Sequence, residues 1–255
     1  MRTAEELRAL VESSLMDMKL SPELGELSGA MRYALAGGGK RIRPVLCLAT
    51  AEAAGCEPER ALAAAVALEL VHSFSLVHDD LPALDDDVER RGQPSTHIQW
   101  GEAVAILAGD ALFGEAVQLA LTYSDPAVAR ELVEATLGMI GGQYLDITAA
   151  SDLAELHRLK TGRLFTAAVG MALAAAGVPR AKQAPWRLFA EELGLLFQLV
   201  DDILDRDGYV LVHGVEGTRK LAEEAGQRAK DLLAEIPADT SVLEEIVAGL
   251  VTRTS

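Results

Sequence analysis

Hydrophobic residues recur along nearly the whole chain with the spacing of helices, and no segment shows the alternation typical of a strand. Glycine and proline mark several segment ends, as at Gly37-Gly38-Gly39 and at Gly177-Val178-Pro179. The pattern predicts helices at about 3–18, 22–36, 43–54, 58–80, 96–122, 126–146, 151–176, 185–207, 218–236 and 240–252. Because no long linker, repeat or low-complexity stretch divides the chain, residues 1–255 are expected to form a single all-α domain of about ten helices.

The composition agrees with close-packed helices and restricts the possible partners. Of the 255 residues, 50% are hydrophobic and only 4% are aromatic, which favours helical packing over a sandwich or barrel. The 39 acidic and 23 basic residues give a net charge of −16, so we expect no nucleic-acid partner and no anionic-membrane surface. Any phosphate that this protein binds therefore needs a local group of cations or a bound metal ion.

Three further features predict a cytoplasmic protein without a membrane span. The charged residues Glu5 and Glu6 argue against a signal peptide at the start. The longest uncharged run, residues 164–179, is shorter than the roughly 20 apolar residues that a span requires. Cys47 and Cys56 match no zinc-site spacing and make no disulfide framework, so we expect reduced thiols.

A dense group of carboxylates follows the apolar segment 58–80. Five carboxylates fall within nine positions, namely Asp79, Asp80, Asp85, Asp86 and Asp87. They crowd the end of a helix, where the helix dipole disfavours anions, and magnesium would compensate this crowding because carboxylate oxygens are its natural ligands. Pro82 would end the helix and let Asp79 and Asp85 converge. The alternative is a solvated acidic loop.

The segment 185–207 carries a second polar group on an otherwise apolar helix. Its narrow polar strip consists of Gln198, Asp201, Asp202 and Asp205. A helix that is apolar on both sides of such a strip is expected to be buried, with the strip facing a cavity or an ion, although a solvated polar face is the alternative. Two acidic groups in one helical chain predict a cage in which several Mg²⁺ ions bind a diphosphate.

Clustered cations are available for a second diphosphate that is bound without metal. Lys40, Arg41 and Arg43 follow the glycine run, and backbone amides and guanidinium groups suit phosphate oxygens. Arg90 and Arg91 follow the first acidic group, where they either reach a diphosphate or neutralise the aspartates.

Three polar residues lie within apolar helices. His72 is seven positions before Asp79 and so shares its helix face, either as a binding residue or as a satisfied core histidine. Lys160 and Thr161 put a charge and a hydroxyl into the mostly apolar segment 151–176, which by itself is a weak sign of function.

Taken in order, these residues resemble the motifs of the trans-prenyl diphosphate synthases, the polyprenyl synthetase family. The resemblance covers most of the chain and is carried by residues 38–44 (Gly-Gly-Lys-Arg-Ile-Arg-Pro), Asp79 to Asp85 with Arg90-Arg91-Gly92, Gly141-Gly142-Gln143, Lys160-Thr161-Gly162, and Phe197-Gln198 before Asp201 to Asp205. It implies the isoprenoid-synthase fold, with helices around a central cavity, usually as a homodimer, and is strongest to bacterial farnesyl and geranylgeranyl diphosphate synthases.

The resemblance also implies roles for individual residues. Two of three expected Mg²⁺ ions would be held by Asp79 and Asp85 with Asp80, and the third by Asp201 with Asp202 and Asp205 close by. Arg90 would hold the allylic diphosphate. Isopentenyl diphosphate would be held by Lys40, Arg43, His72 and Arg91. The catalytic residues beside the developing allylic cation would be Lys160, Thr161 and Gln198.

The implied reaction is Mg²⁺-assisted ionisation of dimethylallyl or geranyl diphosphate, followed by attack of isopentenyl diphosphate to give farnesyl diphosphate. In this family, bulk just before the first aspartate motif limits the product length. Phe74, five positions before Asp79, resembles bacterial farnesyl diphosphate synthases, whereas its neighbour Ser75 is too small to close a cavity. Geranylgeranyl diphosphate is the alternative product.

The chain departs from the family after Asp205. Most members carry a lysine-containing loop there, whereas residues 206–217 contain no lysine and form a shorter segment. Arg206, Arg219 or Lys220 could substitute for the missing lysines. The departure leaves open a non-catalytic subunit that binds prenyl diphosphates, although both aspartate motifs are complete. A terpene cyclase or head-to-head condensing enzyme is a third alternative, which the basic group at Lys40 disfavours.

Overall fold

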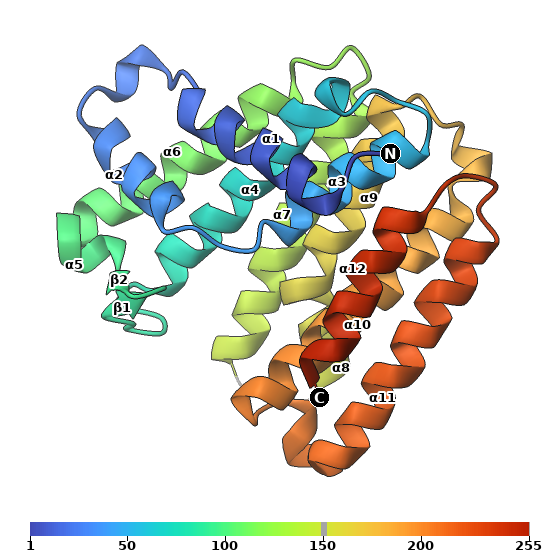
Figure 1. Ribbon diagram of the computed structural model, residues 1–255. Helices are drawn as coiled ribbons and strands as arrows, with labels where there is room; N and C mark the ends of the chain where they lie inside the picture. Colours follow the sequence, from blue (N-terminus) through green and yellow to red (C-terminus); the bar gives the residue numbers. More distant parts are fainter. Residues whose placement is uncertain (149–151, 255) are drawn as a thin grey trace.

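The computed structural model describes residues 1–148 and 152–254 and is almost entirely helical (Figure 1). The longer helices are α1 (Ala4–Asp17), α2 (Leu27–Ala36), α3 (Ile42–Ala53), α4 (Pro58–Asp79), α6 (Glu102–Ala120), α7 (Ala127–Ile147), α9 (Arg163–Ala175), α10 (Ala184–Asp205), α11 (Tyr209–Ala234) and α12 (Ser241–Val251). The shorter elements are η1 (Pro22–Leu24), α5 (Thr96–Trp100), α8 (Leu153–His157), η2 (Arg158–Gly162), η3 (Arg180–Lys182) and η4 (Thr252–Thr254). The prediction of an all-α fold is confirmed.

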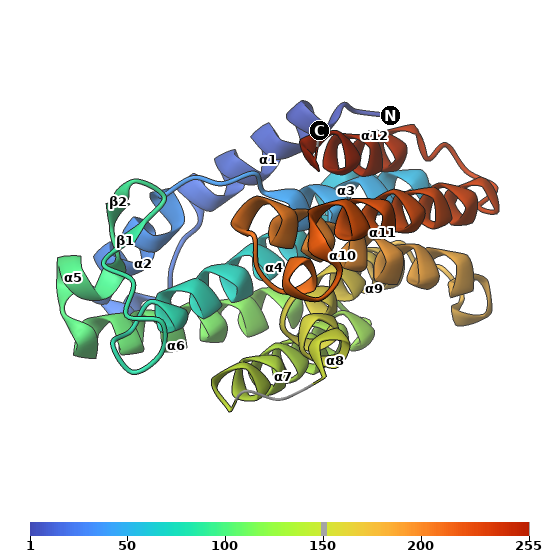
Figure 2. The same ribbon diagram turned by 90° about the horizontal axis from the view of Figure 1, so that it is seen from below.

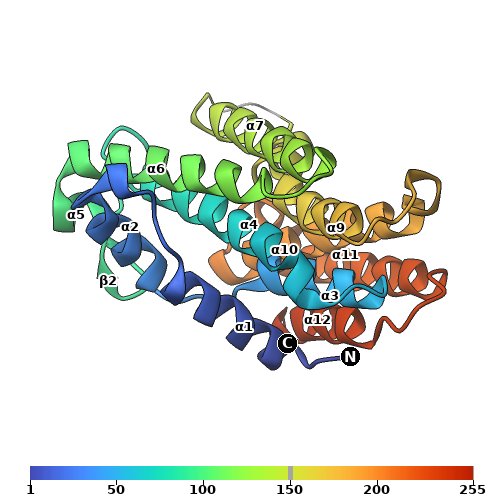
Figure 3. The same ribbon diagram turned by 90° about the horizontal axis from the view of Figure 1, so that it is seen from above.

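Helix α4 lies at the centre of the molecule. It packs against α3, α6 and α9, and Figure 3 shows it between α6 on one side and α3 on the other. Helix α9 in turn packs against α7 and α10, and α10 against α11. Seen from below, α10, α11 and α12 form the half of the molecule away from α2 and α5 (Figure 2). Alanine, leucine and valine dominate the buried residues, and their small volumes allow the helices to approach closely.

Local sequence signals explain several helix ends. Helix α1 starts with a capping box, in which the Thr3 side chain accepts from the Glu6 N–H while the Glu6 carboxylate accepts from the Thr3 N–H. Helix α4 starts with Pro58 in its first turn and ends at Asp79, before Pro82. Pro82 cannot continue a helix, so the first acidic group begins where the chain turns.

Glycines divide two of the predicted helices. The segment 96–122 is not one helix but α5 and α6, because Gly101 adopts a φ of 84° between them. The segment 22–36 is likewise divided into η1 and α2 at Gly25, where φ is 48°. In both cases the hydrophobic pattern continues across the break, so periodicity alone could not detect it.

Three other boundaries also differ from the prediction. Residues 208–217, predicted as a loop, are mostly helical because α11 begins at Tyr209 and continues across a kink at Gly214. The predicted segment 151–176 contains a π-helical turn, η2, between α8 and α9, and residue 151 lies outside the described residues. A short antiparallel hairpin, β1 (Glu89–Arg90) with β2 (Gln93–Pro94), was not predicted, because two-residue strands carry no alternation.

Two helices are apolar and long enough, by composition, to cross a membrane. In α4, 61% of the apolar window is buried, as is typical of a core helix, whereas in α6 only 39% is buried. The length of uncharged runs in the sequence indicated neither helix, because Glu69 interrupts the run in α4 and Asp110 interrupts the run in α6. Glu69 is buried and paired with Arg41, so it does not prevent α4 from being a core helix.

Candidate active site

Two cavities of about 390 Å³ each share Arg43 and His72 in their walls. The first, which we call the central cavity, lies between α4, α7 and the η2–α9 segment. Most of its wall is apolar. The second, which we call the basic cavity, lies between the glycine-rich bend before α3 and helix α10.

Ten of the predicted site residues line one or both of these cavities. The central cavity is lined by Arg43, His72, Phe74, Ser75, Asp79, Lys160 and Thr161. The basic cavity is lined by Lys40, Arg43, His72, Arg91 and Asp201. The remaining predicted residues line neither cavity, namely Asp80, Asp85, Arg90, Gln198 and Asp205.

The chain turn after α4 brings Asp79 and Asp85 together. The backbone N–H of Asp85 donates to the carbonyl of Asp79 at 2.9 Å, and Asp86 adopts a positive φ of 52° in the turn. Burial raises the pKa of Asp79 to about 6, opposed by Lys160 and reinforced by Asp85. Burial also raises the pKa of Asp85. The cations of the protein therefore do not fully compensate the negative charge of these two carboxylates.

The hairpin β1–β2 takes Arg90 to Asp80 rather than to the central cavity. The Arg90 guanidinium donates to Asp80 from Nε at 2.9 Å and to Asp87 at 2.8 Å. The Asp80 carboxylate is 2% exposed, so this pairing compensates a buried charge. In this arrangement Asp80 and Arg90 support the turn that carries Asp79 and Asp85.

The adjacent Asp201 and Asp202 on α10 point to different surroundings. Asp201 lines the basic cavity, and burial raises its pKa to about 6, while Arg253 opposes and Asp205 reinforces this shift. Asp202 is 4% exposed and accepts hydrogen bonds from the Gln198 amide and from the Tyr209 N–H. Asp205 is exposed near the end of α10. The second motif thus divides between a cavity-facing and a buried carboxylate.

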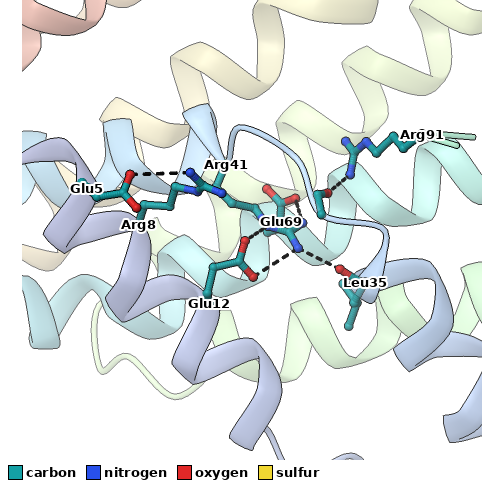
Figure 4. A network of polar contacts seen from close by, with 8 residues as sticks. Glu5, Arg8, Glu12, Leu35, Arg41, Glu69 and Arg91 are labelled. Atoms are coloured by element: carbon teal, nitrogen blue, oxygen red, sulfur yellow. Dashed lines mark hydrogen bonds and ion pairs between the residues drawn. The ribbon is translucent and has the colours of Figure 1, made fainter.

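The arginines at the glycine-rich bend have different partners. Figure 4 shows Arg41 pointing to Glu12 and Glu69; its Nε donates to Glu12 at 2.8 Å and its guanidinium to Glu69 at 2.5 Å. Arg91 reaches the bend from the hairpin and donates to the Gly38 carbonyl. Gly39 adopts a φ of 138°, which favours glycine, and a Cβ there would also lie 2.8 Å from the Arg91 guanidinium. Both Arg41 and Arg91 line the basic cavity, but the Arg41 guanidinium is paired with Glu12 and Glu69 and is therefore structural.

Arg43 and His72 lie where the two cavities meet. The Arg43 guanidinium lies 5.0 Å from the Phe165 ring and 5.5 Å from the Phe197 ring, and its buried Nε has no hydrogen-bond partner among the described residues. Burial, with help from the Arg43 and Arg91 cations, lowers the pKa of His72 well below its ordinary value. At neutral pH the imidazole is therefore a neutral hydrogen-bonding group beside an unpaired cation.

The π-helical turn η2 presents Lys160 and Thr161 to the central cavity. The Lys160 ammonium pairs with Asp146 of α7 at 2.5 Å, and the Thr161 hydroxyl donates to the Gln198 amide oxygen at 2.7 Å. Helix α7 approaches this turn so closely that a Cβ at Gly142 would lie 2.6 Å from the Lys160 Cα. Gly142 therefore fixes the distance between α7 and η2.

We expect Gly142→Ala to destabilise the protein, because an overpacked backbone contact typically costs about 1–3 kcal/mol. Gly141→Ala is the matched control, since no atom lies within 4 Å of its added Cβ, and alanine there should be neutral or stabilising by up to about 1 kcal/mol. Thermal and urea unfolding measure both changes. Equal stabilities for the two variants would contradict the close contact.

Two cavity residues were not assigned a role from the sequence. Gln143 lines the central cavity, and neither Nε2 nor Oε1 of its buried amide has a hydrogen-bond partner within the described residues. Its place beside the Gly141-Gly142 pair was the available signal. Arg253 of η4 lines the basic cavity with Lys40 and Asp201. No local pattern could indicate this, because only the fold brings the C-terminal segment to the bend.

The carboxylates Asp79, Asp85 and Asp201 fit hard divalent cations bound together with a diphosphate, whereas the cations Lys40, Arg43 and Arg91 of the basic cavity fit a diphosphate bound without metal. Asp79 and Asp201 are half-buried carboxylates with raised pKa values, so each gains from an added positive charge. Within residues 1–148 and 152–254, no three His, Cys, Asp or Glu side chains form a ready-made metal site. Magnesium typically takes one or two carboxylates plus phosphate oxygens, so the carboxylates and a diphosphate would complete the site together.

Comparison with known proteins places this geometry in a family. The chain matches the polyprenyl synthetase family over residues 25–214, which is most of its length, and the match ends at the kink of α11. The chain therefore belongs to the polyprenyl synthetase family, and it is a prenyltransferase. The resemblance found in the sequence motifs is confirmed.

Similar proteins make products of two lengths. Farnesyl diphosphate synthase of Haemophilus influenzae is 37% identical over 261 residues, covering 89% of this chain and 88% of that protein. Geranylgeranyl diphosphate synthase of Cyanophora paradoxa is 39% identical over 233 residues, covering 85% and 75%. The solved structure of a geranyltransferase from Legionella pneumophila superposes with a TM-score of 0.86 at 33% identity, covering 98% and 94%. Such similarity establishes the short-chain class without distinguishing the product.

Proposed function

We propose that the protein condenses isopentenyl diphosphate with an allylic diphosphate, dimethylallyl or geranyl, to give farnesyl diphosphate. The observation that carries this proposal is the pair of cavities joined at Arg43 and His72. One cavity combines an acidic rim with an apolar wall, as an allylic diphosphate with its hydrocarbon tail requires. The other combines several cations, as a diphosphate bound without its own metal ions requires.

The proposed metal ligands are Asp79 and Asp85, supported by Asp80, and Asp201 with Asp205. Three Mg²⁺ ions are expected with substrate, and when bound they would neutralise the diphosphate and assist its departure. The apolar residues of the central cavity exclude water, which would otherwise capture the allylic cation. Lys160, Thr161 and Gln198 are the proposed polar groups near that cation.

The basic cavity has the cations that a second diphosphate needs. Lys40, Arg43 and Arg91 are proposed to bind isopentenyl diphosphate, with neutral His72 as an additional hydrogen-bonding group. Arg253 adds a cation at the same cavity. Since the basic cavity meets the central cavity at Arg43, the alkene of one substrate would lie next to the reacting carbon of the other. The alkene attacks the allylic carbon, and the released diphosphate is the proposed acceptor of the proton that is then lost.

Farnesyl diphosphate is the proposed product because Phe74 narrows the central cavity. The ring is 9% exposed and contacts Phe113 at 5.7 Å and His78 at 5.0 Å between ring centroids. It therefore lies between α4 and α6 as a rigid part of the cavity wall. Geranylgeranyl diphosphate is the second candidate, favoured by the similarity to the Cyanophora protein.

We expect Phe74→Ala to lengthen the main product by at least one isoprene unit, because removing the ring extends the cavity between α4 and α6. Mass spectrometry of the products measures the chain length. Ser75→Ala is the matched control and should leave the length unchanged, since Ser75 is already small. An unchanged product profile for Phe74→Ala would reject Phe74 as the limit.

A homodimer in the cytoplasm is the proposed state of the protein. Exposed apolar side chains gather on α5, α6 and α7, including Trp100, Ile106, Leu107 and Leu137. Apolar patches of this kind are typical of subunit interfaces, and light scattering would test the dimer. Cys47 and Cys56 are buried free thiols, which suits a reducing compartment.

The purified chain, supplied with isopentenyl diphosphate, Mg²⁺ and either allylic primer, tests the proposed reaction. We expect release of diphosphate and a prenyl diphosphate product identified by mass spectrometry. Activity of the chain alone would exclude a non-catalytic subunit and would show that the segment after Asp205 needs no lysine. Absence of diphosphate release with every primer would refute the proposal.

A further inference from the structure

A continuous row of hydrogen bonds lies behind Thr161 and links three helical elements. The Thr161 hydroxyl of η2 donates to Gln198 Oε1 of α10 at 2.7 Å, and Gln198 Nε2 donates to Asp202 Oδ1 at 2.6 Å. The backbone N–H of Tyr209, in the first turn of α11, donates to the other oxygen, Asp202 Oδ2, at 2.7 Å. Of these side chains, Thr161 lines the central cavity, and Asp202 lies behind it.

The Asp202 carboxylate determines the direction of every bond in this row. An ionised carboxylate only accepts hydrogen bonds, so Gln198 must present its NH₂ group to Asp202. The carbonyl end of the Gln198 amide then faces Thr161, and the Thr161 hydroxyl must use its single proton to donate to it. Only the lone pairs of the Thr161 oxygen remain for the central cavity. Without Asp202, the Gln198 amide could turn by half a rotation and reverse this order.

The surroundings hold Asp202 in place. Its carboxylate is 4% exposed, and the Tyr209 N–H cannot turn away because it belongs to the backbone of α11. Gly208 leaves the space that the carboxylate occupies, since a Cβ there would lie 2.6 Å from Asp202 Cγ. His157 Nδ1 lies 4.0 Å from Asp202 Oδ2. The position of Asp202 is therefore fixed by the Tyr209 N–H besides Gln198, in a space that Gly208 leaves open.

We propose that Asp202 is a positioning residue for the condensation, which acts through Gln198 to direct the lone pairs of Thr161 at the allylic carbon. This inference rests on the proposed function. When the allylic C–O bond breaks, its electron pair leaves with the diphosphate and the allyl group becomes positive. An oxygen lone pair aimed at that group stabilises it, whereas a hydroxyl proton aimed at it would raise its energy.

The variant Asp202→Asn is expected to reverse the direction of these hydrogen bonds without removing them. The new asparagine amide must accept the Tyr209 N–H with its carbonyl oxygen, so its NH₂ group faces Gln198. Gln198 then turns its carbonyl to that NH₂ group and its own NH₂ to Thr161, and the Thr161 proton is released towards the cavity. We expect kcat to fall on the order of 10- to 100-fold, with little change in the KM for isopentenyl diphosphate and in the thermal midpoint.

Two combined variants distinguish this role from a structural one. Asp202→Asn with Gln198→Glu keeps the net charge and again gives Thr161 an acceptor, so it should recover about 10-fold of the lost kcat. In a Thr161→Val background, Asp202→Asn should have no further effect, because the hydroxyl through which it acts is missing. Asp207→Asn is the matched control, since Asp207 caps the Gly208 N–H at the same junction and should have normal kcat.

Rate measurements on the purified variants decide the inference. A normal kcat for Asp202→Asn, an equal loss in the Thr161→Val background, or no recovery with Gln198→Glu would each overturn it. These results differ from a failure of the proposed function, in which the unmodified chain itself would release no diphosphate. A lower thermal midpoint for Asp202→Asn with unchanged kcat would show that Asp202 serves only to cap α11.

Discussion

Asp79→Asn is expected to lower the rate of diphosphate release by about 10³-fold or more, because it removes a metal-binding carboxylate at the rim of the central cavity. Asp79 combines several features that a purely structural carboxylate would not need. It lies at the end of α4, where the helix dipole disfavours an anion, and it has Asp85 next to it. Asp201→Asn should have a comparable effect, since Asp201 is the proposed ligand of the third metal ion.

The same substitution is expected to stabilise the metal-free protein. The pKa of Asp79 is about 6 in the folded chain against an ordinary value of 3.8, so the folded state binds this proton more tightly than the unfolded state. Stability therefore falls as the pH rises through this interval, and the loss is complete above it. Asparagine removes the ionisation, and we expect a gain of about 1–2 kcal/mol near neutral pH after solvent screening is allowed for.

Steady-state diphosphate release and thermal unfolding without Mg²⁺ measure the two effects of Asp79→Asn. Asp231→Asn is a matched control on the exposed face of α11, where the carboxylate accepts a hydrogen bond from Gln227. It should change neither quantity. A near-normal rate for Asp79→Asn would refute the metal assignment, and a lower thermal midpoint would contradict the claim that Asp79 is insufficiently compensated.

The helical fold was predictable because the periodicity of apolar residues extends over most of the chain. What periodicity could not give is the direction of neighbouring side chains. Asp201 and Asp202 are adjacent, so they lie about 100° apart around α10, and their environments depend on how the helix is rotated against α9 and α11. The same holds for Arg41 and Arg43, of which one is fully paired and the other faces two cavities.

Contacts over long distances in the chain were equally inaccessible from the sequence. The pair of Arg90 with Asp80 is a closer contact, made across the β1–β2 hairpin, and it was one of the two alternatives that the sequence left open for Arg90. Arg253 reaches the basic cavity only because α12 packs near α3 and α10. Arg253 therefore acquires its neighbours from elements that are distant in the chain. Local spacing could suggest that these residues are functional, but it could not show which groups they contact.

The arginines of the glycine-rich bend allow a sharp test of how the two cavities work. Arg43→Met is expected to raise the KM for isopentenyl diphosphate by about 10²-fold, because the charge-assisted hydrogen bonds of the guanidinium to phosphate are lost. The stability should stay the same or rise. Burial lowers the pKa of Arg43, its Nε has no partner among the described residues, and a thioether packs well over the adjacent Phe165 and Phe197 rings.

Arg41→Met is the matched substitution two positions away, and it should give the opposite result. The Arg41 side chain is 1% exposed and is paired with both Glu12 and Glu69, so its removal leaves Glu69 as an uncompensated buried carboxylate. Breaking such a pair typically costs about 3–5 kcal/mol, which urea unfolding would detect. Equal loss of stability in the two variants, or an unchanged KM in Arg43→Met, would contradict this division of roles. The expected contrast would mean that the Arg43 cation, which lies over two phenylalanine rings, is retained for substrate binding at the expense of stability.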